Sequence, residues 1–251
     1  MEIGAQFYTV RNKCTNLEDF SETLARVAEI GYKTVQISGV CAYEPEWLDE
    51  QLKKNGLRCV LTHYNAEEIK NDPLGTLNKH KAFGCNNVGI GCMPGLVSEE
   101  TVVSFIENFK KPAQIISQNG GSFFYHNHAF EFEKDKDGKF FLDRLLEAFT
   151  KEELKITFDT YWGAFAGMDL VDVIEKLDGR LECVHLKDLK MVDNKQQMAV
   201  VGEGNINFGK LIPLFEKAGT KYLLVEQDDT YGECPFECLK KSYKNLKAMG
   251  L

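Results

Sequence analysis

Short apolar runs alternate with amphipathic stretches along the chain. The first amphipathic stretch, Leu17–Ala28, places apolar residues three or four positions apart and is followed by Gly31. This spacing predicts a helix that buries one face and ends at the glycine. The β-branched run 33–39 (KTVQISG) comes next and predicts a strand. Comparable lysine-containing segments that end in glycine, at Gly56, Gly84 and Gly219, also precede apolar runs.

Eight apolar runs of this kind predict eight strands. They cover residues 3–10, 33–39, 58–64, 86–92, 122–128, 154–162, 181–188 and 222–228. Nearly continuous apolar strands separated by helices are typical of a parallel sheet whose outer face is covered. Eight such units in 251 residues predict one (β/α)8 barrel domain spanning 1–251. The alternative is an open doubly wound sheet, which the missing glycine-rich nucleotide turn after the first strand disfavours.

The predicted strand ends collect polar and titratable side chains. In a barrel of this kind the active site forms at the carboxyl ends of the strands. Four of the five histidines fall there, and only His80 lies in a predicted helix. The side chains expected at this rim are His63, His126, His128, Asp159, His185, Lys187 and Glu226. Alternation along a strand pairs His126 with His128, Asp159 with Tyr161, His185 with Lys187, and Glu226 with Asp228 on shared faces.

Asp159, His185 and Glu226 form a mixed oxygen and nitrogen donor set. Such a set suits Mn²⁺, Co²⁺, Zn²⁺ or Fe²⁺ better than a thiolate-preferring metal. Each residue also has an ordinary structural interpretation, because a strand histidine is often a hydrogen-bonded core residue and a strand-end aspartate often caps the next helix. Three of them at one rim favour a metal site.

The glycine-rich segment 201–209 (VGEGNINFG) does not fit the GxGxxG spacing of nucleotide-binding turns. Glu203 lies inside it, and an acid there repels phosphate, so a sugar-phosphate site is not expected. Turn chemistry is the alternative explanation for Gly202 and Gly204. A serine hydrolase is not expected either, because the chain lacks a GxSxG elbow.

Composition narrows the function classes further. The net charge of −8 disfavours a nucleic-acid partner, which usually needs a basic footprint. No apolar run approaches the roughly 18–20 residues of a membrane span, and the N-terminus does not resemble a signal peptide. We therefore expect a cytoplasmic protein with reduced thiols. Four of the eight cysteines, at 59, 85, 92 and 183, lie in or beside apolar runs and are expected to be buried.

Several segments match a known family in order. They are AEIGYKTVQISG, YHNHAFEF, FDTYWGAFAGMD, VHLKD, GEGNINF and LLVEQDD. Together they resemble the sugar phosphate isomerase/epimerase group of xylose isomerase-like TIM barrels, over nearly the whole chain from Gln6 to Asp229. Relatives in that group include tagatose epimerases, hydroxypyruvate isomerase, inosose dehydratase and endonuclease IV. The last is disfavoured, because it binds DNA and uses several metals.

The resemblance implies a ligand at the end of the fifth strand, followed by Asp159, His185 and Glu226. The epimerases of the family place a glutamate in the fifth-strand position and use two glutamates as acid and base. This chain has Tyr125-His126-Asn127-His128 there, and the nearest acid is Glu131. Inosose dehydratase-like members carry a similar histidine-rich stretch. Either His126 replaces the glutamate as ligand, which we favour, or Glu131 folds back to the metal.

The family resemblance implies an isomerase or epimerase of a small unphosphorylated sugar or keto-sugar. One divalent ion, Mn²⁺ in the first place and otherwise Co²⁺, Zn²⁺ or Mg²⁺, would acidify the C–H next to a carbonyl. The alternative is a lyase or dehydratase acting on a keto-sugar, inosose or 3-keto-glycoside at the same site. A metal-dependent sugar-binding protein is a third possibility, and the chain is a candidate homo-oligomer.

Roles follow for individual residues. Glu226 is expected to be both ligand and base, with Lys187 or a histidine handling the second proton, and His128 or His63 as the acid of a lyase. His63, Trp162 and Glu203 are the predicted substrate contacts, although a tryptophan can equally be a core residue. A lysine beside a bound cation should have a lowered pKa. The structural alternative for Lys187 is a salt bridge to Asp188 or Asp228.

Overall fold

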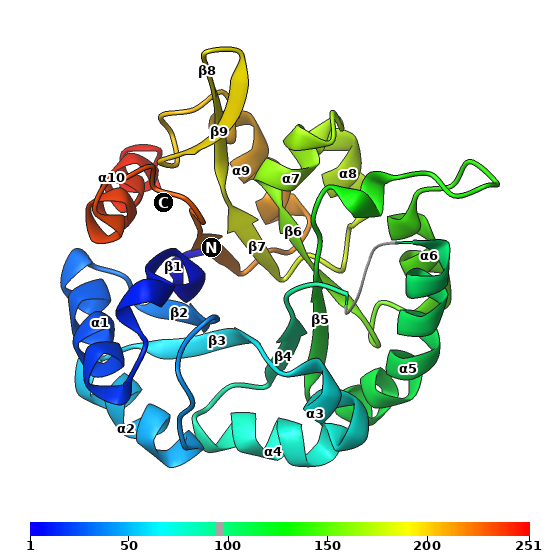
Figure 1. Ribbon diagram of the computed structural model, residues 1–251, viewed down its shortest axis with the longest axis horizontal. Coiled ribbons are helices and arrows are strands. Elements are labelled where there is room, and N and C mark those ends of the chain that lie inside the picture. Colours follow the sequence, from blue (N-terminus) through cyan, green and yellow to red (C-terminus); the bar gives the residue numbers. More distant parts are fainter. Residues whose placement is uncertain (94–97) are drawn as a thin grey trace.

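Eight parallel strands close into a barrel in the computed structural model, which describes residues 1–93 and 98–251. Their order around the barrel is β1, β10, β7, β6, β5, β4, β3, β2, and β2 pairs with β1. Figure 1 shows this ring with helices outside it. The strands are β1 (Glu2–Gln6), β2 (Thr34–Ile37), β3 (Arg58–His63), β4 (Asn87–Ile90), β5 (Ser122–His126), β6 (Lys155–Asp159), β7 (Cys183–Leu186) and β10 (Tyr222–Val225). Closure confirms the (β/α)8 barrel and excludes the open sheet.

Helices pack around the outer surface of the barrel. They are α1 (Leu17–Ile30), α2 (Pro45–Asn55), α3 (Ala66–Asn71), α4 (Pro73–Ala82), α5 (Glu99–Gln118), α6 (Phe141–Ala148), α7 (Thr160–Phe165), α8 (Leu170–Lys176), α9 (Phe208–Lys217) and α10 (Pro235–Ala248). The predicted first helix and its stop at Gly31 match α1. Among the described residues, no helix combines the length and apolarity needed to cross a membrane.

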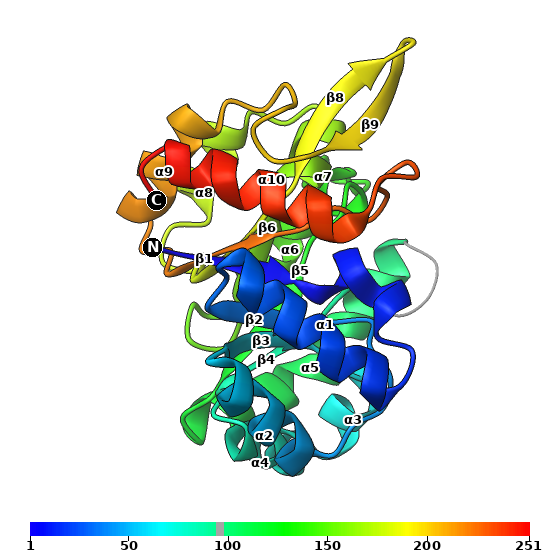
Figure 2. The same cartoon turned by 90° about the vertical axis from the view of Figure 1, so that its left-hand side faces the viewer.

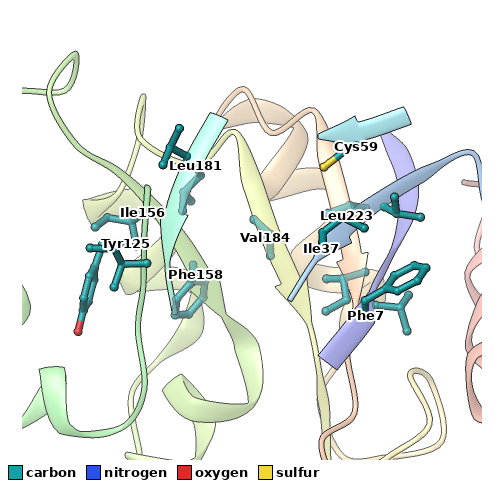
Figure 3. Packing of buried hydrophobic residues seen from close by; sticks show 14 of the residues in the cluster. Phe7, Ile37, Cys59, Tyr125, Ile156, Phe158, Leu181, Val184 and Leu223 are labelled. Atoms are coloured by element: carbon teal, nitrogen blue, oxygen red, sulfur yellow. The ribbon is translucent and has the colours of Figure 1, made fainter. Parts of the chain in front are cut away.

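Alternate strand residues divide the core into two parts. Outward-pointing side chains such as Ile156, Val184 and Leu223 join the large cluster between strands and helices (Figure 3). Phe124 and Leu224 belong to a small separate cluster, on the strand positions whose neighbours two residues later are His126 and Glu226. Because side chains repeat with period two, the polar side chains at the rim continue the inward face of these strands.

All eight strands end earlier than predicted, and for two of them the local reason is clear. β1 stops at Gln6 instead of Val10, because the side-chain oxygen of Gln6 accepts the N–H of Tyr8 and a 3-10 helix, η1 (Phe7–Lys13), follows. β6 stops at Asp159 instead of Trp162, because the Asp159 carboxylate caps α7. Tyr161 therefore lies on a helix, and the prediction that it shares a strand face with Asp159 is wrong.

A β-hairpin that the apolar pattern did not predict follows β7. It pairs β8 (Asp188–Val192) with β9 (Lys195–Ala199) in antiparallel register. The turn residues Asp193 and Asn194 both have positive φ, 49° and 60°, as a two-residue hairpin turn requires. Figure 2 shows the hairpin projecting away from the barrel.

The buried-cysteine prediction holds for three of the four positions. Cys59, Cys85 and Cys183 are buried, whereas Cys92 is exposed. Cys92 follows the end of β4 and lines cavities at the rim of the barrel instead of packing in the core.

Candidate metal centre and active-site cavity

Four buried side chains converge at the carboxyl ends of neighbouring strands. His126 ends β5, Asp159 ends β6, His185 lies in β7, and Glu226 directly follows β10. These strands are consecutive in the barrel, and Asp159 is paired in register with His185. One nitrogen or oxygen atom from each of the four lies within 4.8 Å of the others. We call these four residues the ligand cluster.

His185 has one ring nitrogen held by the protein and one directed at the carboxylates. Its Nε2 lies 2.6 Å from Oε1 of Gln36, an oxygen that only accepts hydrogen bonds, so the proton is on Nε2. Nδ1 lies 2.8 Å from Oε2 of Glu226 without the geometry of a hydrogen bond. A lone pair facing an ionised oxygen at this distance fits two ligands of one cation.

His126 also has one ring nitrogen held by the protein and the other directed at a carboxylate. Its Nδ1 donates to the carbonyl oxygen of Gly91 over 2.9 Å, and its Nε2 lies 3.2 Å from Oδ2 of Asp159. Burial lowers the pKa of His126, but the hydrogen bond and charge of Asp159 outweigh burial and leave the pKa raised. A proton or a metal ion between Nε2 and the carboxylate would satisfy both groups. The residues present are therefore compatible with a bound metal ion.

Each carboxylate of the ligand cluster is anchored by one oxygen. Oδ1 of Asp159 accepts the backbone N–H groups of Tyr161 and Trp162 at 2.8 and 3.1 Å. Oε1 of Glu226 accepts a hydrogen bond of 2.7 Å from Nε2 of Gln6. Burial raises the pKa of both acids, yet the neighbouring cations outweigh it and the pKa of each is lowered. Both stay ionised at neutral pH, with the second oxygen facing the histidines.

Lys187 adds a buried cation beside the ligand cluster. Its Nζ lies 2.7 Å from Oδ2 of Asp228 and 3.4 Å from one oxygen each of Asp159 and Glu226. Burial lowers the pKa of Lys187, but the three carboxylates outweigh it and raise the pKa above its ordinary range. The predicted lowering of the Lys187 pKa refers to a lysine beside a bound cation and stays a prediction. Of the two salt bridges considered as the structural alternative, the one to Asp228 is formed.

Asp188 serves another purpose, which explains the glycine-rich segment. Its carboxylate accepts N–H groups from Leu189, Gly202, Gly204 and Ile206 over 2.8–3.2 Å. A Cβ on Gly204 would lie 2.3 Å from Oδ1 of Asp188, so only glycine fits. The backbone donors that could have bound a phosphate are thus occupied by the chain's own carboxylate.

The fifth-strand alternative is placed away from the ligand cluster. Glu131 is buried, its Oε1 accepts the hydroxyl of Tyr125, and its Oε2 accepts the backbone N–H of His128 at 2.7 Å. Burial raises the pKa of Glu131 to about 7, more than these hydrogen bonds lower it. Both oxygens are engaged by the chain, whereas His126 contributes to the ligand cluster.

A cavity of about 250 Å³ opens beside the ligand cluster, between the rim histidines and Lys187. Its lining includes Tyr8, Ser38, His63, His126, His128, Lys187, Glu226 and Asp228. Nδ1 of His63 lies 3.1 Å from Oγ of Ser38. Among the described residues, Nε2 of His63, Nδ1 of His128 and Oδ1 of Asp228 are buried without a hydrogen-bond partner, so polar atoms remain available to a ligand.

Three lining groups have shifted pKa values. Burial, reinforced by His126, lowers the pKa of His63 well below its ordinary value and that of His128 to about 3. Burial and the charge of Glu226 raise the pKa of Asp228 to about 6, against the opposing effect of Lys187. At neutral pH the two histidines are therefore neutral and Asp228 is ionised.

Comparison with known proteins agrees with the closed barrel and its motifs. A family model described as xylose isomerase-like TIM barrel matches residues 24–248. The chain belongs to the xylose isomerase-like TIM barrel family. This confirms the resemblance read from the sequence.

Proteins similar to this chain carry different activities in their names. Inosose dehydratase of Geobacillus kaustophilus (strain HTA426) is 23% identical over 246 residues, covering 82% of this chain and 76% of that protein. The structure of a sugar phosphate isomerase/epimerase from Parabacteroides distasonis ATCC 8503 has a TM-score of 0.81 and 20% identity, covering 98% and 94% of the two chains. The IolI protein, described with a bound zinc atom, has a TM-score of 0.69 and 13% identity over 99% and 98%.

Most of the predicted site residues of this family member lie together. His63, His126, His128, Lys187 and Glu226 line the cavity, and Asp159 and His185 complete the ligand cluster behind it. Trp162 lies beside the cavity, with its ring 5.3 Å from that of His128. Glu203 is exposed on the turn after β9 and lies outside the residues that line the cavity. Its assignment as a substrate contact stays a prediction.

Three polar residues that hold the ligand cluster or Lys187 in place were not singled out as site residues from the sequence. Gln6 and Gln36 orient Glu226 and His185, and Asp228 pairs with Lys187. A signal for both glutamines was present, because each is a polar residue on the inward face at the end of an otherwise apolar strand (EIGAQ and TVQI). Asp228 lies two residues after Glu226 in the segment that follows β10, and both lie close to Lys187.

Proposed function

We propose that the chain is a metal-dependent enzyme that removes a proton next to the carbonyl of a small unphosphorylated keto-sugar or cyclic polyol ketone. The observation that carries the proposal is the ligand cluster, four buried ligand atoms within 4.8 Å beside a polar cavity. A divalent ion held there would polarise a carbonyl oxygen and acidify the adjacent C–H. The two nitrogen and two oxygen donors favour Mn²⁺, Co²⁺ or Zn²⁺, and the zinc described for the IolI protein supports this class.

Lys187 and Asp228 are the residues that we assign to proton transfer. Nζ of Lys187 lies 2.7–3.4 Å from three carboxylates and would supply an N–H to an oxygen of the substrate. Oδ1 of Asp228 is buried without a partner among the described residues, whereas both oxygens of Glu226 already face Gln6 or His185. Asp228 is thus better placed than Glu226, the base expected from the sequence, to accept the proton.

The arrangement supports a dehydratase above an epimerase. Lys187 follows β7, and Glu226 and Asp228 follow the neighbouring strand β10. His63 belongs to β3, which lies across the barrel from β7. An epimerase must remove a proton from one face of a carbon and deliver one to the other, which needs ionisable groups on both walls. The opposite wall offers neutral imidazoles. One charged wall would suffice for a dehydration, in which Asp228 takes the proton next to the carbonyl and Lys187 gives a proton to the departing β-hydroxyl, so that water leaves. The inosose dehydratase relative supports the same choice.

An unphosphorylated substrate is supported by the charges around the cavity. Lys187 is the one cationic side chain among the described lining residues, and three carboxylates surround it. The backbone donors of the glycine-rich segment are occupied by Asp188. A phosphate group would therefore find no unpaired basic side chain among the described lining residues and no free backbone donors in the glycine-rich segment.

The reaction is tested in D₂O with a panel of ketoses, inososes and 3-keto-glycosides, with the metal content measured in parallel. A dehydratase gives a product lighter by one water, and activity disappears after chelation and returns with added Mn²⁺, Co²⁺ or Zn²⁺. An isomerase, the second candidate on the strength of the Parabacteroides structure, gives an isotope-labelled isomer without loss of water. Metal-independent turnover, or no turnover of any panel member by the metal-loaded protein, would contradict the proposal.

A further inference from the structure

A second, larger cavity of about 650 Å³ adjoins the one beside the ligand cluster. Its walls are mainly apolar and aromatic, formed by Met93, Phe130, Phe132, Trp162 and Phe165 together with His128. Its volume lies in the range of about 300–1,000 Å³ that holds drug-sized ligands. A small polyol alone does not need an apolar compartment of this size. The apolar wall therefore suits a ligand that also carries an apolar group.

The two cavities are neighbours, because His128 and Cys92 line both. The ring of His128 lies 4.7 Å from that of His126 in the ligand cluster and 5.3 Å from that of Trp162 in the apolar wall. One imidazole ring therefore separates the ligand cluster from the aromatic compartment. A ligand with oxygens at the ligand cluster reaches this compartment by extending past His128.

The boundary also offers hydrogen-bonding atoms. Nδ1 of His128 and Nε1 of Trp162 are both buried and have no partner within the described part of the chain. The indole N–H is a donor only, and the imidazole can donate or accept. An oxygen that links a sugar to an apolar group would pass both atoms.

The aromatic rings present faces on which a flat group can stack. Phe130 lies parallel to His128, with an interplanar angle of 6° and centroids 5.8 Å apart. Phe165 is 46% exposed and contacts Trp162 edge to face at 5.6 Å. Offset and edge-to-face packing of a further ring is favourable in such a frame.

We infer that the outer cavity is a subsite for an aromatic substituent, so that the substrate is a sugar carrying an aryl group through an ether oxygen. The inference rests on the proposed function, because it assumes that the sugar part occupies the inner cavity. It names the substrate class as aryl-substituted keto-sugars instead of free keto-sugars.

The test uses two unreactive probes, phenyl β-D-glucopyranoside and methyl β-D-glucopyranoside. The chain has two tryptophans, at 47 and 162. A Trp47→Phe background leaves Trp162 as the fluorescent reporter in the outer cavity, since Trp47 lies in α2 against Phe20. We expect the phenyl glucoside to bind about tenfold more tightly than the methyl glucoside and to quench Trp162 fluorescence.

Two variants distinguish binding at the subsite from nonspecific binding of the phenyl group. Phe165→Ala removes an exposed wall residue and should reduce the phenyl preference at least threefold while leaving methyl glucoside binding unchanged. Leu74→Ala, at a residue of α4 that is 41% exposed, is the matched control and should keep the full preference. Equal affinity for the two probes, or a preference that Phe165→Ala leaves intact, would overturn the inference.

The outcome is distinguishable from failure of the proposed function. Metal content and turnover of small keto-sugars in D₂O do not depend on the outer cavity. If those succeed while the two glucosides bind equally, the subsite is wrong and the enzyme assignment stands. If the phenyl preference is found but no metal-dependent turnover is, the cavity binds aryl groups and the substrate assignment falls with the proposed function.

Discussion

His80 and the rim histidines are the same residue type in two different settings. His80 is fully buried in α4, with Nε2 2.7 Å from Oγ1 of Thr62 and Nδ1 2.7 Å from the carbonyl oxygen of Thr76. Burial lowers its pKa to about 4. At the rim, in contrast, His63, His128 and His185 each keep a buried ring nitrogen without a hydrogen-bond partner among the described residues.

The difference shows that burial alone does not separate a structural histidine from a functional one. A buried polar atom left unpaired costs about 1–3 kcal/mol, so a fold keeps such atoms mainly where something outside the chain completes them. His80 needs nothing beyond its own neighbours. Several unpaired atoms gathered around two carboxylates indicate a place where a ligand supplies the missing partner.

The largest expected effect comes from breaking the ligand cluster. Asp159→Asn keeps Oδ1 as the cap of α7 but removes the negative charge that faces the histidines. We expect bound divalent metal and turnover to fall by orders of magnitude while the far-ultraviolet circular dichroism spectrum stays unchanged. Metal analysis by mass spectrometry measures the first, and full occupancy in the variant would end the assignment.

His80→Ala is the matched control for that variant. It removes a buried histidine whose partners all belong to the chain, and leaves Oγ1 of Thr62 without its partner. We expect normal metal content and turnover with a loss of about 1–3 kcal/mol in the free energy of unfolding, measured by denaturant titration. Loss of metal in this variant would erase the distinction between the two settings.

The next effect is smaller and concerns Lys187. Lys187→Met removes the cation but keeps much of the side-chain length, so the ligand cluster retains its metal donors. We expect metal to be retained and kcat to fall about 100-fold or more, as for loss of an interaction made in the transition state. A variant with normal kcat and only a lower melting temperature would show that the contact with Asp228 is structural.

Gln36→Ala tests whether a rim histidine depends on the chain to hold one of its ring nitrogens, because it removes the partner of Nε2 of His185. Without Oε1 of Gln36, nothing fixes the proton on Nε2, and the ring can present the wrong tautomer. We expect metal affinity to weaken about 10- to 100-fold, measured by competition with a chelating dye. Glu203→Gln, on an exposed turn, serves as the control and should leave the affinity unchanged. An unchanged affinity in Gln36→Ala would show that the glutamine does not orient the ligand.

Glu131 carries the smallest effect and extends the comparison to carboxylates. Its pKa is raised to about 7 in the folded chain from an ordinary 4.5, so the folded state keeps a proton that the unfolded state has lost between these values. Stability therefore falls as pH rises from about 4.5 to 7, by at most about 3 kcal/mol. In Glu131→Gln this decline should be absent, so its melting temperature, followed from pH 5 to 8, should fall less than that of the parent. Parallel curves would contradict the raised pKa.

The sequence predicted the barrel because its period-two and period-3.6 patterns are local. It missed the early ends of β1 and β6, since Gln6 and Asp159 end those strands through their own side-chain hydrogen bonds, which apolarity does not encode. The hairpin of β8 and β9 escaped because it is polar on much of both faces.

The sequence indicated individual residues of the candidate site, but it could not predict the contacts between them. Histidines and acids at strand ends indicated His185 and Glu226, but the glutamine that holds each of these side chains in place lies on another strand. Gln36 is 149 positions from His185, and Gln6 is 220 positions from Glu226. Only closure of the barrel brings these pairs together, so no spacing in the sequence could reveal them.

The carboxylate of Asp188 has a consequence for protein engineering. It ties the start of the hairpin at β8 to the segment at Gly202 and Gly204 that follows β9. Both legs of the hairpin are thereby fastened at its base, and the tip at Asp193 and Asn194 stands away from the barrel (Figure 2). A reporter domain or affinity tag inserted at this tip would be joined to the barrel by a hairpin whose base is held by hydrogen bonds. Exposed loop tips are also places where insertions are well tolerated.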